Sequence, residues 1–250
     1  MKIIISPAKK MNVNTDILAY KDLPVFLDKT EILMQWIQKL SYEEAKKLWD
    51  CNDKIAEQNF KRFHEMNLKK NLTPAILSYE GIQYQYMAPI VFEGKEMEYI
   101  QQHLRILSGF YGVLKPFDGV TPYRLEMQAK VKGLFGTKDL YEFWGDRIYN
   151  ELSDDDHIIL NLASKEYAKN IERYLKKEDY FVTCIFGEVV NGKVQQKGTM
   201  AKMARGEMVR YMAENQIKDV KEIQKFHRLG YVYHEELSGE KEYVFLKEGE

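Results

Sequence analysis

The sequence predicts an α/β fold of the mixed α+β kind: a single domain with a mixed central sheet, flanking helices and a basic cleft. Short apolar runs such as Lys2–Ser6 and His157–Leu162 indicate buried strands. Longer amphipathic stretches, such as residues 28–68 and 199–215, indicate helices that cover such strands. No internal repeat, low-complexity run or linker divides residues 1–250, so we expect one domain.

Composition restricts the classes of function. The chain of 250 residues is 45% hydrophobic and 30% charged, which is typical of a globular protein with a substantial core. Its 37 basic and 38 acidic residues give a net charge of −1. Any surface that binds nucleic acid must therefore come from local clustering of positive charge.

The cysteines and the apolar runs indicate a cytoplasmic protein. Cys51 and Cys184 lie far apart and match no metal or disulfide spacing, so we interpret them as reduced thiols. The run Ile3–Ile5 is too short for a signal peptide, and no stretch has the length of a membrane span. We expect no membrane partner.

The chain begins with a buried strand over Lys2–Ser6, which Pro7 ends. Lys9 and Lys10 follow this strand, and residues at the carboxyl ends of central strands commonly face a ligand. A solvated turn explains the two lysines equally well.

Residues 28–68 form a mainly helical region. Apolar positions between Ile32 and Leu40 predict one helix, and Ser41 with Glu44 forms a capping box that begins the next. A third helix spans Asp53–Glu65. We assign these helices to the scaffold.

The following segment is predicted to change from strand to helix. Ile82, Tyr84 and Tyr86 alternate, which favours cross-strand packing, although tyrosines there can also stack on a base. Glu96–Leu107 then predicts an amphipathic helix that ends at Ser108-Gly109.

The stretch Phe110–Lys132 is rich in aromatic and charged residues, and neither helical nor strand periodicity holds across Gly109–Pro122. Ordered irregular segments with aromatic and charged residues often carry function, and a packed connecting loop is the simpler alternative. Gly109–Gly112 has the small-residue pattern of a helix-hairpin-helix turn, whose amides hold a phosphate. The chain, however, continues into Lys115-Pro116 rather than into a second helix.

The second half of the chain alternates helices and strands. A helix is predicted over Asp139–Leu152, and Asn161 and Ser164 then lie at a strand-to-helix junction, where free amides favour anions. Helix capping alone would also explain Ser164. Hairpins are predicted over 180–197, turning at Asn191-Gly192, and over 230–247.

The helix at residues 199–215 carries a basic face. Lys202, Arg205 and Arg210 lie opposite its methionine-rich side, and Gly206 lies within the basic face. A glycine inside a helix costs about 1 kcal/mol relative to alanine, which indicates a close approach to the backbone there. A solvated face, with the glycine packed on a neighbouring element, explains the pattern equally well.

These observations define the candidate site residues. The anion-binding or nucleic-acid-binding candidates are Lys9, Arg124, Lys130, Lys202, Arg205 and Arg210. The pocket candidates are Ser6, Tyr111, Tyr123, Asn161, Ser164 and Gly206. No catalytic residue is identified, but the carboxylates available for acid–base chemistry among them are Glu126 and Asp118.

Motifs spread along the chain match one known family. They are Ser6–Asn12 (SPAKKMN), Ser108–Met127, Leu140–Asp146 (LYEFWGD), Asn161–Tyr167 (NLASKEY), Ala201–Met208 (AKMARGEM) and the ending Phe226–Phe245. In these motifs the chain resembles the YaaA peroxide-stress-response proteins, which are bacterial cytosolic proteins. The resemblance implies protection from hydrogen peroxide by limiting unincorporated iron and oxidative DNA damage. It also implies a positively charged cleft, a helix-hairpin-helix-like element and binding to DNA.

Three hypotheses for function remain. The first is a stress protein that binds duplex DNA without sequence preference, through the basic candidates. The second is an enzyme acting on a nucleotide or damaged nucleic acid, with Asn161, Ser164 and Arg205 holding phosphate and Glu126 or Asp118 as the acid–base group. No recognised catalytic signature supports the second hypothesis.

The third hypothesis, direct iron binding, is the weakest. The five histidines are scattered, and no pair has the spacing of metal ligands on a helix. We therefore predict no metal site, and we expect no cofactor. The predicted partner is DNA, and the sequence identifies no protein partner.

Overall fold

A mixed sheet forms the centre of the molecule in the computed structural model, which describes residues 1–131, 133–134, 136–153 and 156–248. Lys132, the last residue of the irregular stretch singled out above, lies outside the described residues. Within them, the main sheet has eight strands in the order β11-β12-β9-β8-β1-β5-β6, with β10 paired to β9. This sheet with its surrounding helices confirms the predicted mixed α/β class.

The middle strands of the sheet are parallel and the edge strands antiparallel. The parallel strands are β5 (Leu104–Ser108), β1 (Lys2–Ile5), β8 (Ile158–Leu162), β9 (Tyr180–Val190) and β12 (Glu242–Lys247). The antiparallel strands are β6 (Gly112–Leu114), β10 (Lys193–Gln195) and β11 (Tyr231–Tyr233). Ile3, Ile4 and Ile5 are fully buried, as expected for a strand covered on both faces.

Two short strand pairs lie outside the main sheet. They are β2 (Lys10–Met11) with β4 (Tyr79–Glu80), and β3 (Thr73–Pro74) with β7 (Gly119–Val120).

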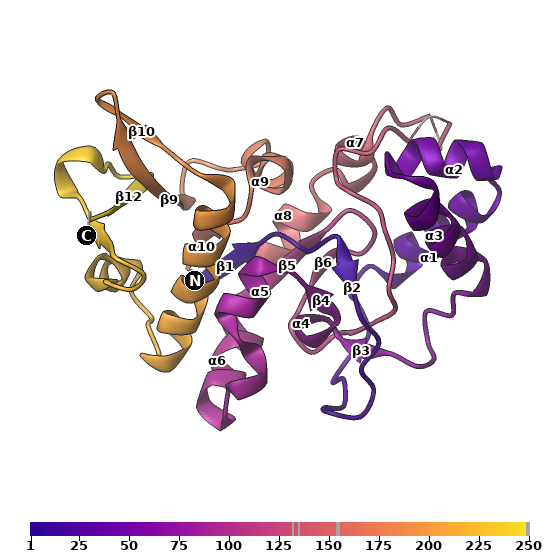
Figure 1. Cartoon of the computed structure of the whole chain (residues 1–250), viewed down its shortest axis with the longest axis horizontal. Coiled ribbons are helices and arrows are strands. Elements are labelled where there is room, and N and C mark those ends of the chain that lie inside the picture. The colour runs from indigo at the N-terminus through magenta and orange to yellow at the C-terminus, as the bar shows by residue number, and fades with distance from the viewer. Residues whose placement is uncertain (132, 135, 154–155, 249–250) are drawn as a thin grey trace.

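Helices cover the sheet and extend one end of the molecule. The α-helices are α1 (Leu27–Gln38), α2 (Tyr42–Trp49), α3 (Asp53–Glu65), α4 (Ala75–Ser78), α5 (Ile82–Met87), α6 (Gly94–His103), α7 (Leu140–Trp144), α8 (Arg147–Leu152), α9 (Lys165–Glu172) and α10 (Gly198–Glu214). Short 3-10 helices occupy Pro89–Val91, Val220–Lys225 and Glu235–Leu237. In Figure 1, α1, α2 and α3 lie at one end and the hairpin β9–β10 with β12 at the other, while α10 runs beside α5 and α6. None of the helices in the described part of the chain has both the length and the apolar character needed to cross a bilayer.

The predicted strand at Ile82–Tyr86 is wrong. This segment forms α5, which begins after Gly81 and packs along α10. Tyr84 is buried there, and its hydroxyl donates to the Ser6 carbonyl oxygen at 3.0 Å. Six residues are too few for the alternation of aromatic side chains to distinguish helix from strand, so tertiary packing decides the conformation.

The predicted helix Glu96–Leu107 extends too far. Helix α6 ends at His103, and Leu104–Ser108 is β5, entirely buried between β1 and β6. Gly109–Gly112 is consequently the turn of the β5–β6 hairpin, with Ser108 paired to Gly112. The helix-hairpin-helix interpretation of this segment is therefore wrong, because strands and not helices flank the turn.

The predicted helix Asp139–Leu152 is divided in two. Asp139 accepts a hydrogen bond from the Glu142 amide at 2.8 Å and begins α7, as its capping position indicated. Gly145 then adopts a positive φ of 55° and ends α7 before α8 begins. Glycine tolerates this left-handed conformation, so the amphipathic pattern continues across a break in the backbone.

The register of the central strands positions the site. In the parallel pair β1–β8, Ile5 lies opposite Leu162, so the segments that follow both strands leave the same edge of the sheet. Ser6 and Ser164, which are 158 positions apart in the sequence, meet there. This edge is the carboxyl end of parallel strands, where ligands bind in open α/β sheets.

Candidate functional site

A pocket of about 530 Å³ opens above the carboxyl ends of β1 and β8, and we call it the basic pocket. Its walls come from the segment after β1, the β4–α5 junction, the irregular stretch, and the beginnings of α9 and α10. The lining residues are 6–10, 80–84, 123–126, Ser164, Glu166, Tyr167, Lys202 and Arg205. Its volume lies in the usual range for sites that hold a small molecule or a single nucleotide unit.

Ser6, Ser164 and Tyr84 line one side of the basic pocket. The Ser164 amide donates to Ser6 Oγ at 2.8 Å, and Ser6 Oγ donates to Ser164 Oγ at 3.3 Å. Ser164 is the N-cap residue of α9, but its side chain makes no capping hydrogen bond. The first two amides of α9, those of Lys165 and Glu166, have no partner within their own helix, whereas the Tyr167 amide donates to the Ser164 carbonyl oxygen at 3.0 Å. Free amides at a helix N-terminus favour an anion.

Several basic side chains of the basic pocket are already paired. Glu126 Oε1 lies 3.0 Å from Lys9 Nζ and 3.3 Å from an Arg124 guanidinium nitrogen. Lys10 Nζ lies 2.5 Å from Glu80 Oε1. Lys9 is exposed whereas Arg124 is largely buried, with side-chain exposures of 66% and 11%, so the Glu126 carboxylate bridges the surface and the interior.

Lys202 and Arg205 differ from these paired cations. Among the described residues, no carboxylate lies within ion-pair distance of either side chain. Lys202 is exposed, whereas Arg205 is partly buried and its Nε is enclosed without a hydrogen-bond partner. Burial lowers the pKa of Arg205, although the guanidinium stays protonated at any physiological pH. The basic pocket therefore contains uncompensated positive charge.

Glu166 in the first turn of α9 is a pocket residue that sequence analysis missed. Burial raises the pKa of Glu166, a hydrogen bond from the Gln128 amide at 3.2 Å opposes the shift, and the nearby Glu126 carboxylate adds to it. An acidic residue near a helix N-terminus is common, since it complements the helix dipole, so the sequence gives no signal for this second role. Gln83, Tyr84 and Tyr167 also line the pocket and were not among the candidates.

The structure brings most of the predicted site residues together. Those that line the basic pocket are Ser6, Lys9, Tyr123, Arg124, Glu126, Ser164, Lys202 and Arg205. Tyr123 is 5% exposed, and its hydroxyl hydrogen-bonds with those of Tyr79, at 2.8 Å, and Ser108, at 2.6 Å. Its ring is therefore fixed in the wall of the pocket.

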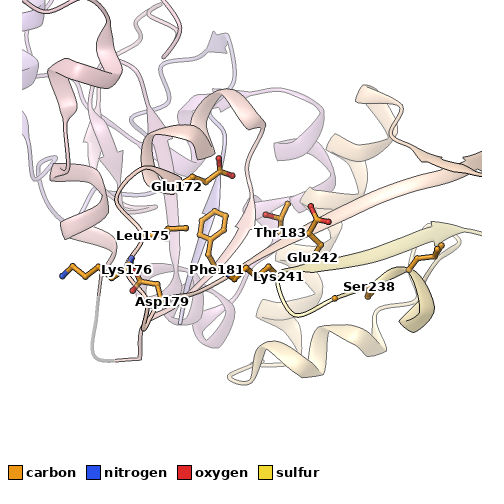
Figure 2. A pocket seen from close by; sticks show the side chains of 11 residues that line it. Glu172, Leu175, Lys176, Asp179, Phe181, Thr183, Ser238, Lys241 and Glu242 are labelled. Atoms are coloured by element: carbon orange, nitrogen blue, oxygen red, sulfur yellow. Dashed lines mark hydrogen bonds between the residues drawn. The ribbon is translucent and has the colours of Figure 1, made fainter.

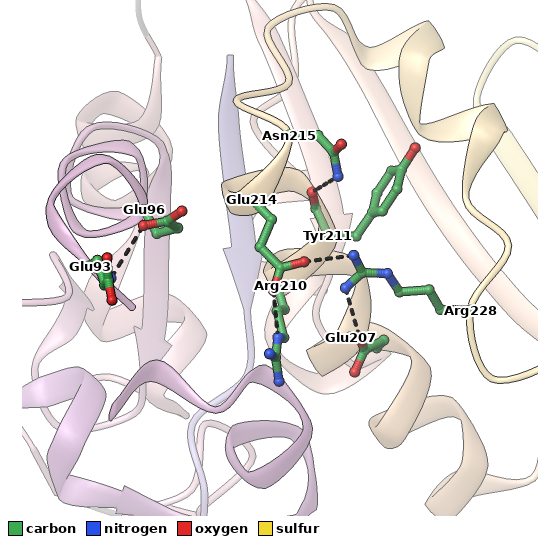
Figure 3. A network of polar contacts seen from close by, with 8 residues as sticks. All are labelled: Glu93, Glu96, Glu207, Arg210, Tyr211, Glu214, Asn215 and Arg228. Carbon is green, nitrogen blue, oxygen red and sulfur yellow. Dashed lines mark hydrogen bonds and ion pairs between the residues drawn. The ribbon is translucent and has the colours of Figure 1, made fainter. Parts of the chain in front are cut away.

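Arg210 and Lys130 do not line the basic pocket. Arg210 Nε lies 2.8 Å from Glu214 Oε1, and Figure 3 shows Arg228 joining the same network. Arg228 contacts Glu207 at 2.9 Å and Glu214 at 2.6 Å, which connects α10 to the C-terminal region. Lys130 is exposed in the irregular stretch.

Tyr111 and Asn161 do not line the basic pocket and have structural partners. Tyr111 is 1% exposed, and its hydroxyl accepts from the Thr121 amide at 3.1 Å. Asn161 Oδ1 accepts from the Ala163 amide at 2.9 Å, which shapes the turn from β8 toward α9. Asn161 thus positions the segment that carries Ser164.

Gly206 lies in the contact between α10 and α5. A Cβ atom there would be 2.1 Å from the carbonyl oxygen of Gln83 and 3.0 Å from the Met87 amide nitrogen. The close approach predicted from the sequence is therefore made by α5, and both helices contribute residues to the basic pocket.

Asp118 is buried outside the basic pocket, with 2% exposure. Its Oδ2 accepts from the Lys115 amide at 2.8 Å, and its Oδ1 is enclosed without a partner. Burial raises the pKa of Asp118 to about 7.

A second cavity of about 500 Å³ lies against β9 and the beginning of β12, and we call it the open cavity. Figure 2 shows the side chains around it, with Glu172 from α9, Thr183 from β9 and Glu242 from β12. Its lining combines acidic and basic residues. Among the described residues, no group of three or more His, Cys, Asp or Glu side chains is arranged to hold a metal ion, here or elsewhere.

Comparison with known proteins identifies the family. The chain matches the family described as "Peroxide stress protein YaaA" over residues 1–237. It is 61% identical over 247 residues to a UPF0246 protein of Lachnoclostridium phytofermentans, covering 99% of this chain and 96% of that protein. A UPF0246 protein of Agathobacter rectalis is 59% identical over 245 residues, covering 98% of both chains. These matches confirm the resemblance drawn from the sequence motifs, and the chain belongs to the peroxide stress protein YaaA family.

Proposed function

We propose that this protein acts in the cytoplasm during peroxide stress by binding double-stranded DNA without sequence preference, and that it helps to limit free iron and oxidative DNA damage. The observation that carries the DNA-binding proposal is the uncompensated charge of Lys202 and Arg205 beside the N-terminus of α9. The family description supports the role in peroxide stress.

The chemistry of the basic pocket suits phosphate more than other ligands. Guanidinium groups and free backbone amides are the usual donors to phosphate oxygens, and both occur in one pocket here. Such contacts carry no base information, because every nucleotide presents the same phosphate group. Positive charge gathered at one site also explains how a chain with a net charge of −1 can bind a polyanion.

The test is fluorescence anisotropy of labelled duplex, gapped and single-stranded DNA across a salt series. We expect affinity to fall steeply with salt, and the slope of log K against log[salt] to decrease by roughly two in Lys202→Ala/Arg205→Ala, since two phosphate contacts are removed. Circular dichroism must show an intact fold in the variant. Absence of binding at low salt, or an unchanged slope in the folded variant, would refute the proposal.

A second candidate function is an enzyme that acts on a nucleotide or damaged nucleic acid in the same pocket. Glu126 and Glu166 both line the basic pocket, and the raised pKa of Glu166 suits a proton donor. The test is mass spectrometry of nucleotides and damaged oligonucleotides after incubation with the wild type and with Glu166→Gln. A product that forms with the wild type and disappears with the variant supports this function.

A further inference from the structure

We propose that the basic pocket recognises a terminal phosphate monoester, carried by a DNA strand end or by a free nucleotide, rather than the internal phosphates of a strand. The inference rests on the proposed function, because it assigns the phosphate chemistry of the same site. It extends that function by naming the part of the nucleic acid that enters the pocket.

The first support is the charge on Arg205. Its Nε is enclosed without a partner, and no carboxylate of the described residues neutralises the guanidinium. Removing a cation from water is costly unless an anion or a set of acceptors replaces the water. The Nε itself is enclosed, so an anion inside the pocket that Arg205 lines would balance the guanidinium charge through its terminal nitrogens.

The second support is a set of donors with no acceptor. Ser6 Oγ accepts from the Ser164 amide and donates to Ser164 Oγ, which leaves the Ser164 hydroxyl hydrogen available for a ligand. The eight-residue helix α9 begins at this point with its first two amides free of intrahelical partners. These groups are hydrogen-bond donors, as a phosphate requires.

The carboxylates of the pocket do not oppose an anion strongly. Glu126 is bridged by Lys9 and Arg124, and Glu80 by Lys10. Glu166 accepts a hydrogen bond from the Gln128 amide, and burial raises its pKa. Five cations and three carboxylates line the pocket, so its lining has a net charge of +2 when all three carboxylates are ionised. Lys202 and Arg205 are the lining cations without an ion-pair partner among the described residues.

The shape and the charge favour a monoester over an internal diester. A terminal phosphate carries a charge of about −1.5 to −2, which matches two unpaired cations, whereas an internal phosphate carries about −1. An internal phosphate also continues into a nucleotide on both sides, and both would have to enter a pocket of about 530 Å³. A strand end or a free nucleotide continues on one side only.

The experiment compares ligands that differ only in their ends. One labelled sequence is prepared with a 5′-phosphate, with a 3′-phosphate, with hydroxyl ends, and as a closed dumbbell without ends, and each affinity is measured at one salt concentration. In parallel, deoxynucleoside 5′- and 3′-monophosphates, the unphosphorylated nucleosides and inorganic phosphate are compared for thermal stabilisation. The first set tests strand ends and the second tests free nucleotides.

We expect at least a tenfold preference for one phosphorylated end or for one monophosphate over its hydroxyl counterpart. Arg205→Gln should abolish the preference. The matched control Arg173→Gln, which removes the same charge from the exposed C-terminal end of α9, should retain it. If Arg205→Gln fails to fold, Lys202→Gln, at an exposed position, replaces it. We then expect the preference for the phosphorylated ligand to fall at least threefold.

The outcomes separate the inference from the proposed function. Equal affinity for all DNA forms, dumbbell included, overturns the inference and leaves DNA binding intact. Failure to bind any DNA, with stabilisation by a monophosphate but not by its nucleoside, overturns DNA binding and supports the inference with a free nucleotide as ligand. A preference that survives in folded Arg205→Gln and Lys202→Gln overturns the assignment to this pocket. If neither set of ligands gives a response, both proposals are overturned.

Discussion

The two cavities of this protein have nearly the same volume, about 530 and 500 Å³, but they balance their charges in different ways. At the open cavity, the buried Asp179 accepts from Tyr149 Oη at 2.7 Å, from the Lys176 amide at 2.6 Å, and contacts His157 Nδ1 at 3.1 Å. In the basic pocket, Arg205 is enclosed with no such partner. Cavity size alone therefore does not distinguish the two cavities, whereas the unpaired guanidinium of Arg205 does.

The walls of the cavities differ as well. In the basic pocket, α5 and α10 are held in direct backbone contact at Gly206, so the residues that they contribute have a fixed spacing. The open cavity is bordered by the end of α9 and by Ser238 and Gly239, which precede β12. Fixed walls hold several hydrogen-bond donors in one geometry, which favours binding of a ligand that needs all of them at once.

The largest loss of stability is expected from Gly206→Ala, which tests the fixed wall. The new methyl group would lie 2.1 Å from the Gln83 carbonyl oxygen, so α5 and α10 must separate. We expect a loss of about 3 kcal/mol or more in the free energy of unfolding, measured by urea denaturation, and weaker DNA binding. Gly198→Ala on the same helix is the control, because a methyl group there meets no atom within 4 Å. Equal stability of the two variants would contradict the account of the wall.

Opposite pH-dependent effects are expected from two enclosed carboxyl groups, Asp118, which lies outside both cavities, and Asp179, which lines the open cavity. Burial raises the pKa of Asp118 to about 7, from about 4 in the unfolded chain. The native state therefore keeps a proton that the unfolded state releases, and stability falls as the pH rises from about 4 to about 7. Asp118→Asn removes the titrating group and with it this pH-dependent loss. We expect the free energy of unfolding of the variant to exceed that of the wild type by up to about 4 kcal/mol at pH 8 and to be almost equal to it at pH 4.

Asp179 should behave in the opposite way. Burial acts to raise the pKa of Asp179, but the hydrogen bonds from Lys176, Tyr149 and His157 outweigh it and leave the pKa below its usual value. Its stabilising contribution is thus present above about pH 4 and is lost as the pH falls through the folded pKa. Denaturation of both Asp→Asn variants at pH 4 and pH 8 measures the contrast. A stability gain at pH 8 in Asp179→Asn, or a loss there in Asp118→Asn, would show that the assigned causes are wrong.

The sequence predicted the strand ends of the site better than its helices. Ser6 and Lys9 follow one buried strand and Ser164 follows another, and the carboxyl ends of parallel strands meet at one edge of a sheet. That rule made the residues after each strand candidates for a site, but it did not predict that the two strands are neighbours. The pairing of β1 with both β5 and β8 could not be read from local patterns, because it joins segments more than 100 positions apart.

The basic face of α10 shows the limit of helical periodicity. Lys202 and Arg205 are about 60° apart around the helix and both reach the basic pocket, whereas Arg210 is rotated by about 140° from Arg205 and lies about 7.5 Å further along the axis. The spacing of the three charges along the sequence predicted one broad basic face. In the structure, Arg210 forms an ion pair with Glu214 instead of lining the pocket. Helix α5 was missed for a similar reason, since its neighbour α10 and not its own sequence determines its conformation.

The most direct test of the central claim removes the same charge from each cavity. Lys202→Ala/Arg205→Ala and Lys176→Ala/Lys241→Ala both lower the net charge by two, the first at the basic pocket and the second at the open cavity. DNA affinity of the folded variants is measured by anisotropy at one salt concentration. We expect at least a tenfold loss for the basic-pocket variant and less than a threefold loss for the open-cavity variant. Equal losses would mean that DNA responds only to total charge, and the assignment of the basic pocket as the binding site would be wrong.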